Sequence, residues 1–426
     1  MKVPVLLLLV SLCFSLALAW QTDTESGSGR PYHYGEESFR HWTRSRQGRF
    51  RVLERFTHEL LEDAVGNYRV AELEAAPRAF LQPSHYDADE VMFVKEGEGV
   101  IVLLRGGKRE SFCVREGDVM VIPAGAVVYS ANTHQSEWFR VVMLLSPVVS
   151  TSGRFEEFFP IGGESPESFL SVFSDDVIQA SFNTRREEWE KVFEKQSKGE
   201  ITTASEEQIR ELSRSCSRGG RSSRSEGGDS GSSSSKWEIK PSSLTDKKPT
   251  HSNSHGRHYE ITGDECPHLR LLDMDVGLAN IARFEMACPH VSGGRSSPRR
   301  ERGHGREEEE EREEEQGGGG GQKSRSYRQV KSRIREGSVI VIPAGHPTAL
   351  VAGEDKNLAV LCFEVNASFD DKVFLAGTNS ALQKMDRPAK LLAFGADEEQ
   401  QVDRVIGAQK DAVFLRGPQS HRVSSV

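Results

Sequence analysis

The sequence predicts a mainly β protein made of two small β-barrels, each followed by a helical extension. Three observations predict this fold. The segment from Arg115 to Gly125 (REGDVMVIPAG) recurs from Arg335 to Gly345 (REGSVIVIPAG), with nine of eleven residues identical. Short apolar runs broken by glycine surround the first copy, and apolar residues at helical spacing follow both copies. An internal repeat of this kind indicates that one structural unit is duplicated.

The strands of the first unit are predicted from short apolar or alternating runs, which are typical of a sandwich or barrel. These runs are Val91–Val94, Val100–Leu104, Ser111–Val114, Val119–Ile122 and Phe139–Leu145. Between Pro166 and Leu212 the apolar residues recur at helical spacing, and a further helix is expected to begin near Ser205. In the second unit, Leu358–Phe363 is the matching strand and Asp397–Ile406 the matching helix.

The chain is expected to divide into four parts. Residues 1–19 are a signal peptide, 31–212 the first barrel with its helical arm, 213–256 a Ser/Gly/Arg-rich linker, and 257–420 the second barrel with its arm. A Glu/Gly-rich insert, 292–328, interrupts the second barrel. Linker and insert hold too little apolar surface for a core, so we expect both to be disordered.

The N-terminus indicates secretion. Lys2 precedes an apolar stretch from Val5 to Leu18, and Ala17-Leu18-Ala19 offers the small-residue pattern at which signal peptides are cleaved. The stretch is short for a membrane span of ~20 residues, so we prefer a signal peptide to a membrane anchor. Five cysteines remain after cleavage, and an odd count means that at least one stays free or pairs between chains.

Composition excludes several classes of protein. Lys and Arg total 55 against 64 Asp and Glu, a net charge of −9, which argues against a nucleic-acid partner. No second long apolar run is present, so no membrane partner is expected once the signal peptide is removed. Six cysteines in 426 residues are too few for a disulfide scaffold.

The repeated motif resembles that of the cupin superfamily, which implies a bicupin fold. Its Gly-x5-Pro-x-Gly pattern is met at Gly117, Pro123 and Gly125, with Asn132 beyond, but Val128 stands where cupins place a metal-binding histidine. Thr348 takes that place in the second copy.

The other cupin motif is also incomplete. His85 and Glu90 keep two of its ligand positions, whereas Pro83 replaces the first histidine. Two ligands out of four rarely hold a divalent ion, so we expect no catalytic metal, and His85 is read as a packed or rim residue.

A closer resemblance is to the vicilins, the 7S globulin seed storage proteins, and among them to the embryo globulins of cereals. It rests on Phe284–His290, Ile340–Pro347, Val360–Asn366 and Val373–Gly377. It implies a non-catalytic nutrient reservoir that requires no cofactor, forms a homotrimer and associates with other storage globulins. It also implies transport from the endoplasmic reticulum to the protein storage vacuole and mobilisation by proteases at the polar segments. Asn366-Ala367-Ser368 is a glycosylation sequon.

The second unit departs from this pattern. Val70 to Val100 spans 30 residues in the first unit, whereas the equivalent stretch, Ile281 to Phe284, spans 3. About two strands of the second barrel are therefore predicted to be missing. Two interpretations stay open: a truncated gene sequence, which we favour, or an impaired second domain.

A metal site is predicted in the second unit. Cys288 and His290 lie two residues apart and would share one face of a strand, and His346 follows the tight turn. Cysteine and histidine suit copper or zinc. In some vicilins, matching residues together with a tyrosine, here Tyr32, hold copper. The alternative is a redox-inert buried cysteine with turn histidines.

Three further hypotheses are weaker. Cys266 and His268 could join Cys288 and His290 in a zinc site, although the spacing is unlike that of zinc knuckles. A germin-like metal oxidase or a cupin isomerase would need the ligands that are replaced. A sugar- or copper-binding relative of the vicilins is the remaining alternative. The histidines of the Ser-rich segment, His251, His255 and His258, are expected to be solvated.

Overall fold

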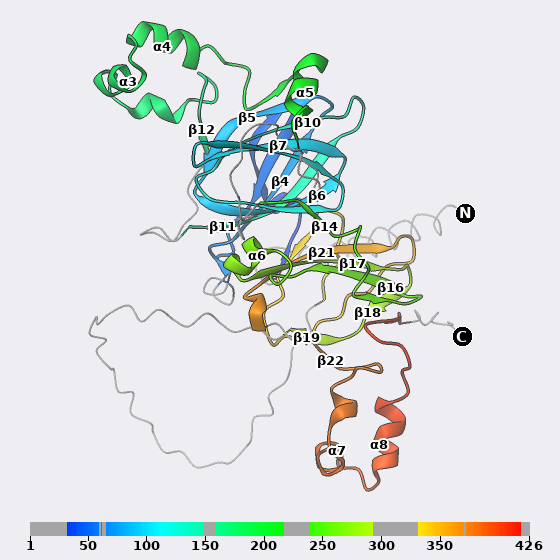
Figure 1. Cartoon of the computed structure of the whole chain (residues 1–426). Helices are drawn as coiled ribbons and strands as arrows, with labels where there is room; N and C mark the ends of the chain where they lie inside the picture. The colour runs from blue at the N-terminus through cyan, green and yellow to red at the C-terminus, as the bar shows by residue number, and fades with distance from the viewer. Residues whose placement is uncertain are drawn as a thin grey trace, which may run out of the picture. The chain divides into compact units, whose positions relative to one another are not determined.

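The structure is a computed structural model that describes residues 32–58, 61, 65–148, 158–216, 239–292, 331–369 and 372–418 (Figure 1). The chain divides into two compact units, one formed by 1–36 with 296–341 and the other by 37–295 with 342–426. In the smaller unit, β1 (His33–Tyr34) pairs antiparallel with β20 (Val339–Ile340). The predicted signal peptide lies outside the described residues, as do 217–238 of the linker and 293–328 of the insert.

The first barrel of the larger unit consists of two antiparallel sheets (Figure 1). One sheet has the order β12 (Phe158–Pro160), β5 (Ala79–Tyr86), β10 (Val127–Asn132), β7 (Glu98–Arg105) and β8 (Lys108–Arg115), with β13 (Ile201–Thr203) also on β5. The other has the order β14 (Ser242–Ser243), β9 (Asp118–Ile122), β6 (Ala88–Glu96), β11 (Phe139–Pro147), β4 (Arg69–Ala75), β3 (Gly48–Leu53) and β2 (Phe39–Ser45). Each of the five predicted strand runs lies within one of these strands, so those predictions are confirmed.

The core of the first barrel lies between its two sheets. Met92 and Val141 from one sheet join Leu103 and Val128 from the other in one buried apolar cluster. Asn132 is fully buried, and its side-chain amide lies 3.0 Å from the carbonyl of Ala75 and 2.8 Å from that of Glu137. This asparagine of the cupin motif therefore fastens the ends of neighbouring strands.

The repeated turn has the same backbone in both copies. Gly117 and Gly125 have φ of +87° and +73°, and Gly337 and Gly345 have φ of +80° and +79°. Only glycine adopts this region without strain, which explains why the turn demands it. A Cβ at Gly117 would also collide with the side chain of Thr245.

The helical arm of the first unit contains η2 (Phe169–Val172), α3 (Asp175–Phe182), α4 (Arg186–Phe193) and α5 (Glu206–Ser213). Ser205 and Gln208 form a capping box that starts α5, which confirms the helix expected there. Trp189 is buried and stacks on Phe193 with ring centroids 4.9 Å apart. No helix within the described ranges is both long and apolar enough to cross a bilayer.

The second barrel is smaller. Its main sheet has the order β15 (His251–Ser252), β16 (Gly256–Ile261), β17 (Met274–Ile281) and β21 (Leu358–Val365). Two short pairs join β18 (Glu285–Ala287) to β23 (Phe414–Arg416) and β19 (His290–Ser292) to β22 (Lys372–Phe374). The remaining elements are α6 (Pro267–Leu272), η3 (Ala367–Phe369), η4 (Leu382–Lys384), α7 (Arg387–Phe394) and α8 (Glu399–Ile406). Residues 242–256 of the segment expected to be a linker thus include two short strands, β14 and β15.

The pairing of the strands shows which parts of the second barrel match the first. β21 pairs with β17 as β11 pairs with β4. β22 and β23 pair with β19 and β18 as β12 and β13 pair with β5, so β18 and β19 together take the place of β5. No described strand corresponds to β6, β7 or β8.

This correspondence shifts the expected gap. The turn from Ile281 to Phe284, where strands were predicted to be missing, matches the short turn between β4 and β5. The strands without a described counterpart would follow Ser292 instead, where residues 293–330 are not described. The shortened second barrel therefore stays a prediction.

Candidate metal centres

The two remaining cupin ligands of the first barrel lie apart. His85 stacks on Phe159 at 4.7 Å between ring centroids and meets Phe169 edge-on at 5.0 Å. Its neighbour Tyr86 packs against the barrel core instead, so the two side chains point to opposite faces of β5. His85 is thus a packed residue on the arm side, and burial lowers its pKa.

Glu90 of β6 belongs to the barrel interior. Its side chain is 6% exposed, and burial raises its pKa to about 7. Its charge also contributes to raising the pKa of Tyr86, after burial itself. Val128, in the place of a metal-binding histidine, is part of the apolar core. The interior of the first barrel therefore offers one carboxyl group among apolar side chains, which does not fit a divalent ion.

The predicted copper ligands of the second unit do not share one strand. β18 ends at Ala287 and β19 begins at His290, so Cys288 and Pro289 form a break between the two strands. The expectation that Cys288 and His290 lie on one continuous strand is therefore wrong, because proline lacks the N–H that a strand ladder needs.

Each predicted copper ligand has other contacts. Cys288 is fully buried, its thiol lies 3.1 Å from the carbonyl of Ala376, and burial raises its pKa. The Nδ1 atom of His290 lies 2.9 Å from the carbonyl oxygen of Cys288. His346 is exposed, with Nδ1 3.3 Å from the carbonyl of Ala344. A thiol held in its protonated form opposes metal binding, since the thiolate is the ligand.

Tyr32 belongs to the smaller unit, where its carbonyl accepts a hydrogen bond from Val341 at 2.9 Å. Cys288, His290 and His346 do not converge as a set of three donors in the described part of the chain. As placed, these residues do not fit a copper ion, and copper binding by them stays a prediction. Cys266 begins α6 and likewise joins no such set with Cys288, so the zinc alternative has no support.

A convergent cluster does occur at another place in the second barrel. Among the described residues, Glu260, Asp275 and Glu364 have carboxylate oxygens within 4.8 Å of one another. The ammonium of Lys372 lies 2.5 Å from Glu364 and 3.4 Å from Glu260. Burial works to lower the pKa of Lys372, but the two carboxylates outweigh it and raise the pKa.

This cluster is therefore an internal ion-pair network in which Lys372 pairs with two of the three carboxyl groups, those of Glu260 and Glu364. Its members come from β16, β17, β21 and β22, and Glu260 and Lys372 lie 112 residues apart in the sequence. Sequence reasoning missed the cluster because no local spacing marks residues that only the barrel brings together.

Two other features lay beyond the sequence prediction. Cys113 and Cys216 form a disulfide, and Cys266, Cys288 and Cys362 form none within the chain. Whether one of these three pairs between chains stays open. His255 is not solvated as expected: its side chain is 16% exposed, and its ring nitrogens lie 3.1 Å from Glu285 and 3.2 Å from Asp411. The predicted glycosylation residue Asn366 directly follows β21, and its use stays a prediction.

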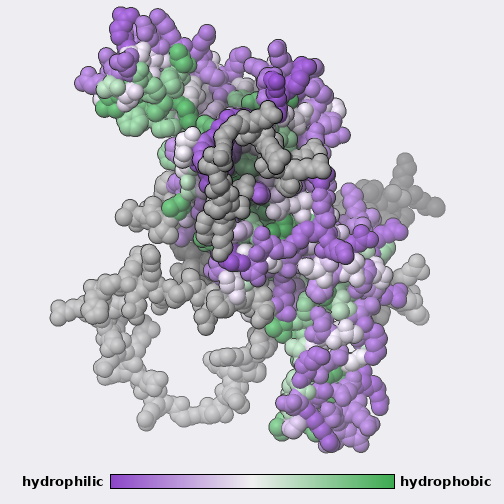
Figure 2. Space-filling view, in the orientation of Figure 1, coloured by the Kyte–Doolittle hydropathy of each residue, from purple (hydrophilic) through white to green (hydrophobic). Residues whose placement is uncertain are grey.

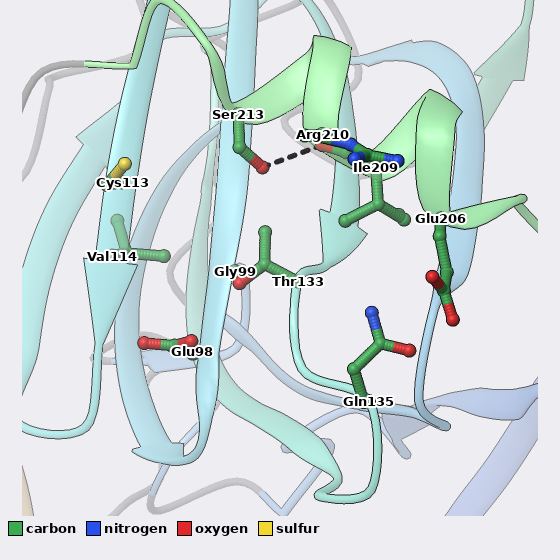
Figure 3. Close-up of a pocket in the computed structure, with 10 residues that line it drawn as sticks. All are labelled: Glu98, Gly99, Cys113, Val114, Thr133, Gln135, Glu206, Ile209, Arg210 and Ser213. Atoms are coloured by element: carbon green, nitrogen blue, oxygen red, sulfur yellow. Dashed lines mark hydrogen bonds between the residues drawn. The ribbon is translucent and has the colours of Figure 1, made fainter.

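A pocket of about 460 Å³ lies between α5 and the sheet that contains β7 and β8 (Figure 3). Its lining residues are Glu98, Gly99, Cys113, Val114, Thr133, Gln135, Glu206, Ile209, Arg210 and Ser213. None of the predicted site residues is among them. The Ser213 hydroxyl donates to the carbonyl of Ile209 at 2.8 Å, so this polar group is satisfied within the helix.

Comparison with known proteins identifies the class. The cupin family model matches residues 47–189 and 242–401, one match for each barrel, and the chain belongs to the cupin family. The vicilin of Corylus avellana has a similar structure, with a TM-score of 0.74 at 36% identity, covering 91% of this chain and all of that one. A vicilin of Solanum melongena has a TM-score of 0.77 at 26% identity, and the match covers 92% of this chain and 99% of that one.

Related sequences make the assignment more specific. Vicilin Jug r 6.0101 of Juglans regia is 39% identical over 91% of this chain and 78% of its own length. Globulin-1 S allele of Zea mays is 40% identical over 91% and 71%. Cupincin of Oryza sativa subsp. indica is 61% identical over 96% and 94%. The protein is a seed storage globulin of the vicilin type, related to cereal globulins.

The Cupincin alignment also bears on the length of the second barrel. It spans 454 positions, more than the 426 residues of this chain. The rice protein therefore carries residues that have no counterpart in this chain.

Proposed function

We propose that this storage globulin is a non-catalytic nutrient reservoir that passes through the secretory pathway to the protein storage vacuole. The observation that supports the absence of catalysis is that the first barrel lacks two of the four cupin metal ligands and does not bring the other two together. His85 stacks on Phe159 outside the core, and Val128 fills the core at the position of another ligand. What remains is a packed barrel that serves as a store of amino acids.

Elemental analysis of the purified protein, combined with an oxalate oxidase assay, tests this proposal. The expected result is less than stoichiometric manganese or iron in the protein and no turnover. A germin-like enzyme treated identically is the positive control. Tightly held manganese or iron together with turnover would refute a purely nutritive role.

Mobilisation by proteases is the second part of the proposal. The Arg-rich stretches near 214–224 and 295–306 offer many trypsin sites in segments whose composition cannot form a core. Limited trypsin digestion of the native protein is expected to cut first within these two stretches. Mass spectrometry of the fragments locates the cuts, and early cleavage confined to the barrels would contradict the idea.

We further propose that the oligomer is a trimer held by the helical arms. Val172 and Val192 of the first arm are 80% and 71% exposed, and Leu392 and Val405 of the second are 84% and 73% exposed. Figure 2 shows hydrophobic surface on the α3–α4 arm. Contacts between different arms of successive copies close into a ring when the rotation permits.

Copper binding is a secondary proposal. Cysteine and histidine are suitable donors, but Cys288, His290 and His346 would have to move together. Copper near one ion per chain that disappears in a Cys288→Ala variant would support it. Copper content that is unchanged by this substitution would place the metal elsewhere.

A further inference from the structure

Strand β21 of the second barrel has one pairing partner where its counterpart has two. In the first barrel β11 lies between β4 and β6 and forms ladders with both. β21 forms a ladder with β17 from Leu358 to Val365, and no other described strand pairs with it. No further backbone hydrogen bond joins residues 358–365 to another described segment. One edge of this eight-residue strand is therefore open among the described residues.

The edge carries none of the usual protection against pairing. β21 has the sequence LAVLCFEV, without proline, lysine or arginine and with one glutamate. Proteins normally protect such an edge with charges, proline or a bulge, because its unpaired N–H and C=O groups otherwise recruit another strand. Its side chains are partly buried or exposed, whereas those of β11 include several that are fully buried.

The neighbouring part of the chain is a poor source for the missing strand. A strand beside β21 would need alternating apolar residues like Val91 and Phe93 of β6, which lie opposite β11. The sequence from 293 to 328 contains no aliphatic side chain. The sequence of this segment therefore does not supply the apolar alternation that such a strand needs.

We propose that β21 pairs antiparallel with β21 of a second copy of this chain, about a two-fold axis. A two-fold axis perpendicular to the sheet keeps each side chain on the same face of the sheet in both copies. Because side chains alternate between faces, the numbers of two residues that lie opposite each other must differ by an even number. The register centred on Cys362 meets this condition. It places Phe363 opposite Leu361 and Val365 opposite Ala359 of the second copy.

This register is favourable in charge and shape. Glu364 lies opposite Val360 of the second copy and not opposite its own equivalent, so no like charges meet. Phe363 and Leu361 form an aromatic–aliphatic cross-strand pair, a type that stabilises sheets by roughly 0.2–1 kcal/mol each. Such a contact is isologous and closes after two copies, independently of the helical arms.

A pair of engineered cysteines tests both the contact and its register. In a Cys362→Ser background, the double substitution Ala359→Cys/Val365→Cys places new thiols opposite each other across the axis. Mild oxidation of the full chain is expected to give a covalent two-chain species on a denaturing gel. Either single substitution is the matched control and gives no covalent two-chain species. The new cysteine and its equivalent in the second copy then lie ~20 Å apart along the strands.

A charge variant provides the second measurement. Ala359 is exposed, so Ala359→Lys leaves the isolated barrel intact but places a lysine on the edge. Light scattering is expected to show loss of the two-fold association through β21, whereas the oligomer held by the arms is kept. Leu104→Lys, on a strand with two partners, is the control and retains the two-fold association. If the double-cysteine variant fails to cross-link and Ala359→Lys changes no mass, the edge is covered by the same chain and the proposal is wrong.

Discussion

Cys113 on β8 and Cys216 just beyond α5 are joined by a disulfide although 103 residues separate them in the sequence. The bond fastens the end of the helix to the sheet on which it packs. Ile209 of α5 is buried there against Val100 and Val102, so the covalent link and the apolar contact hold the same helix.

Breaking this disulfide is expected to lower the free energy of unfolding of the first barrel. A closed loop of about 100 residues is worth about 4 to 5 kcal/mol in the chain-entropy description. Urea denaturation of Cys216→Ser against the wild type measures the difference. Cys266→Ser removes a free thiol and serves as the control, which should leave the midpoint unchanged; equal midpoints for all three proteins would show that the link stabilises nothing.

The buried carboxyl of Glu90 predicts a barrel that is more stable in acid. Its pKa is raised to about 7 in the folded protein from the ordinary value of 4.5. The folded state therefore keeps a proton that the unfolded state releases above pH 4.5. The contribution of Glu90 to stability is therefore greatest below pH 4.5 and falls by about 3 kcal/mol as the pH rises to 7.

Glu90→Gln isolates this effect because glutamine is neutral at every pH. The variant should lose the decline between pH 4.5 and 7, while the remaining pH dependence stays. Chemical denaturation at a series of pH values gives both curves. Parallel curves would mean that Glu90 is ionised in the folded protein.

Arg51 and Glu72 form an ion pair between β3 and β4, with a shortest distance of 2.6 Å and side chains 7% and 15% exposed. Glu72→Ala leaves a guanidinium buried without this partner and should cost about 3 kcal/mol. Replacing both residues by methionine should recover most of the loss, since apolar packing often replaces a buried pair. If Glu72→Ala lowers the free energy of unfolding by less than about 1 kcal/mol, this pair contributes no more than an exposed ion pair does.

The arms are expected to control assembly without controlling folding. Leu392→Asp and Val405→Asp place charges on residues that are 84% and 73% exposed, so the monomer should fold and the oligomer dissociate. Val402→Asp is the contrasting variant because Val402 is buried within the arm and its replacement should unfold the helix. Light scattering and circular dichroism separate these outcomes, and an intact oligomer in both surface variants would exclude the arms from the interface.

Local patterns predicted the strands and helices well because burial on one face imposes a period on the sequence. The runs around Val91 and Val119 and the helix after Ser205 are such cases. The duplicated turn was equally visible, since Gly117 and Gly337 need the same backbone.

The sites were harder to predict because their geometry depends on pairs that sequence spacing does not reveal. Pro289 breaks the strand on which Cys288 and His290 were expected to lie together. The partner of Cys113 could not be chosen among the four other cysteines that remain after signal cleavage. His255 was assigned to solvent from its Ser-rich surroundings, but the fold places it between Glu285 and Asp411.

The position of β23 sets the order in which the protein can be completed during synthesis. The last strand of the first barrel ends at Ser243, so its two sheets can close while translation continues. The second barrel has Phe414 in its core, and the N–H of Cys288 bonds to the carbonyl of Val413. A nascent chain released before these residues would carry one complete barrel and one that lacks β23 and part of its core.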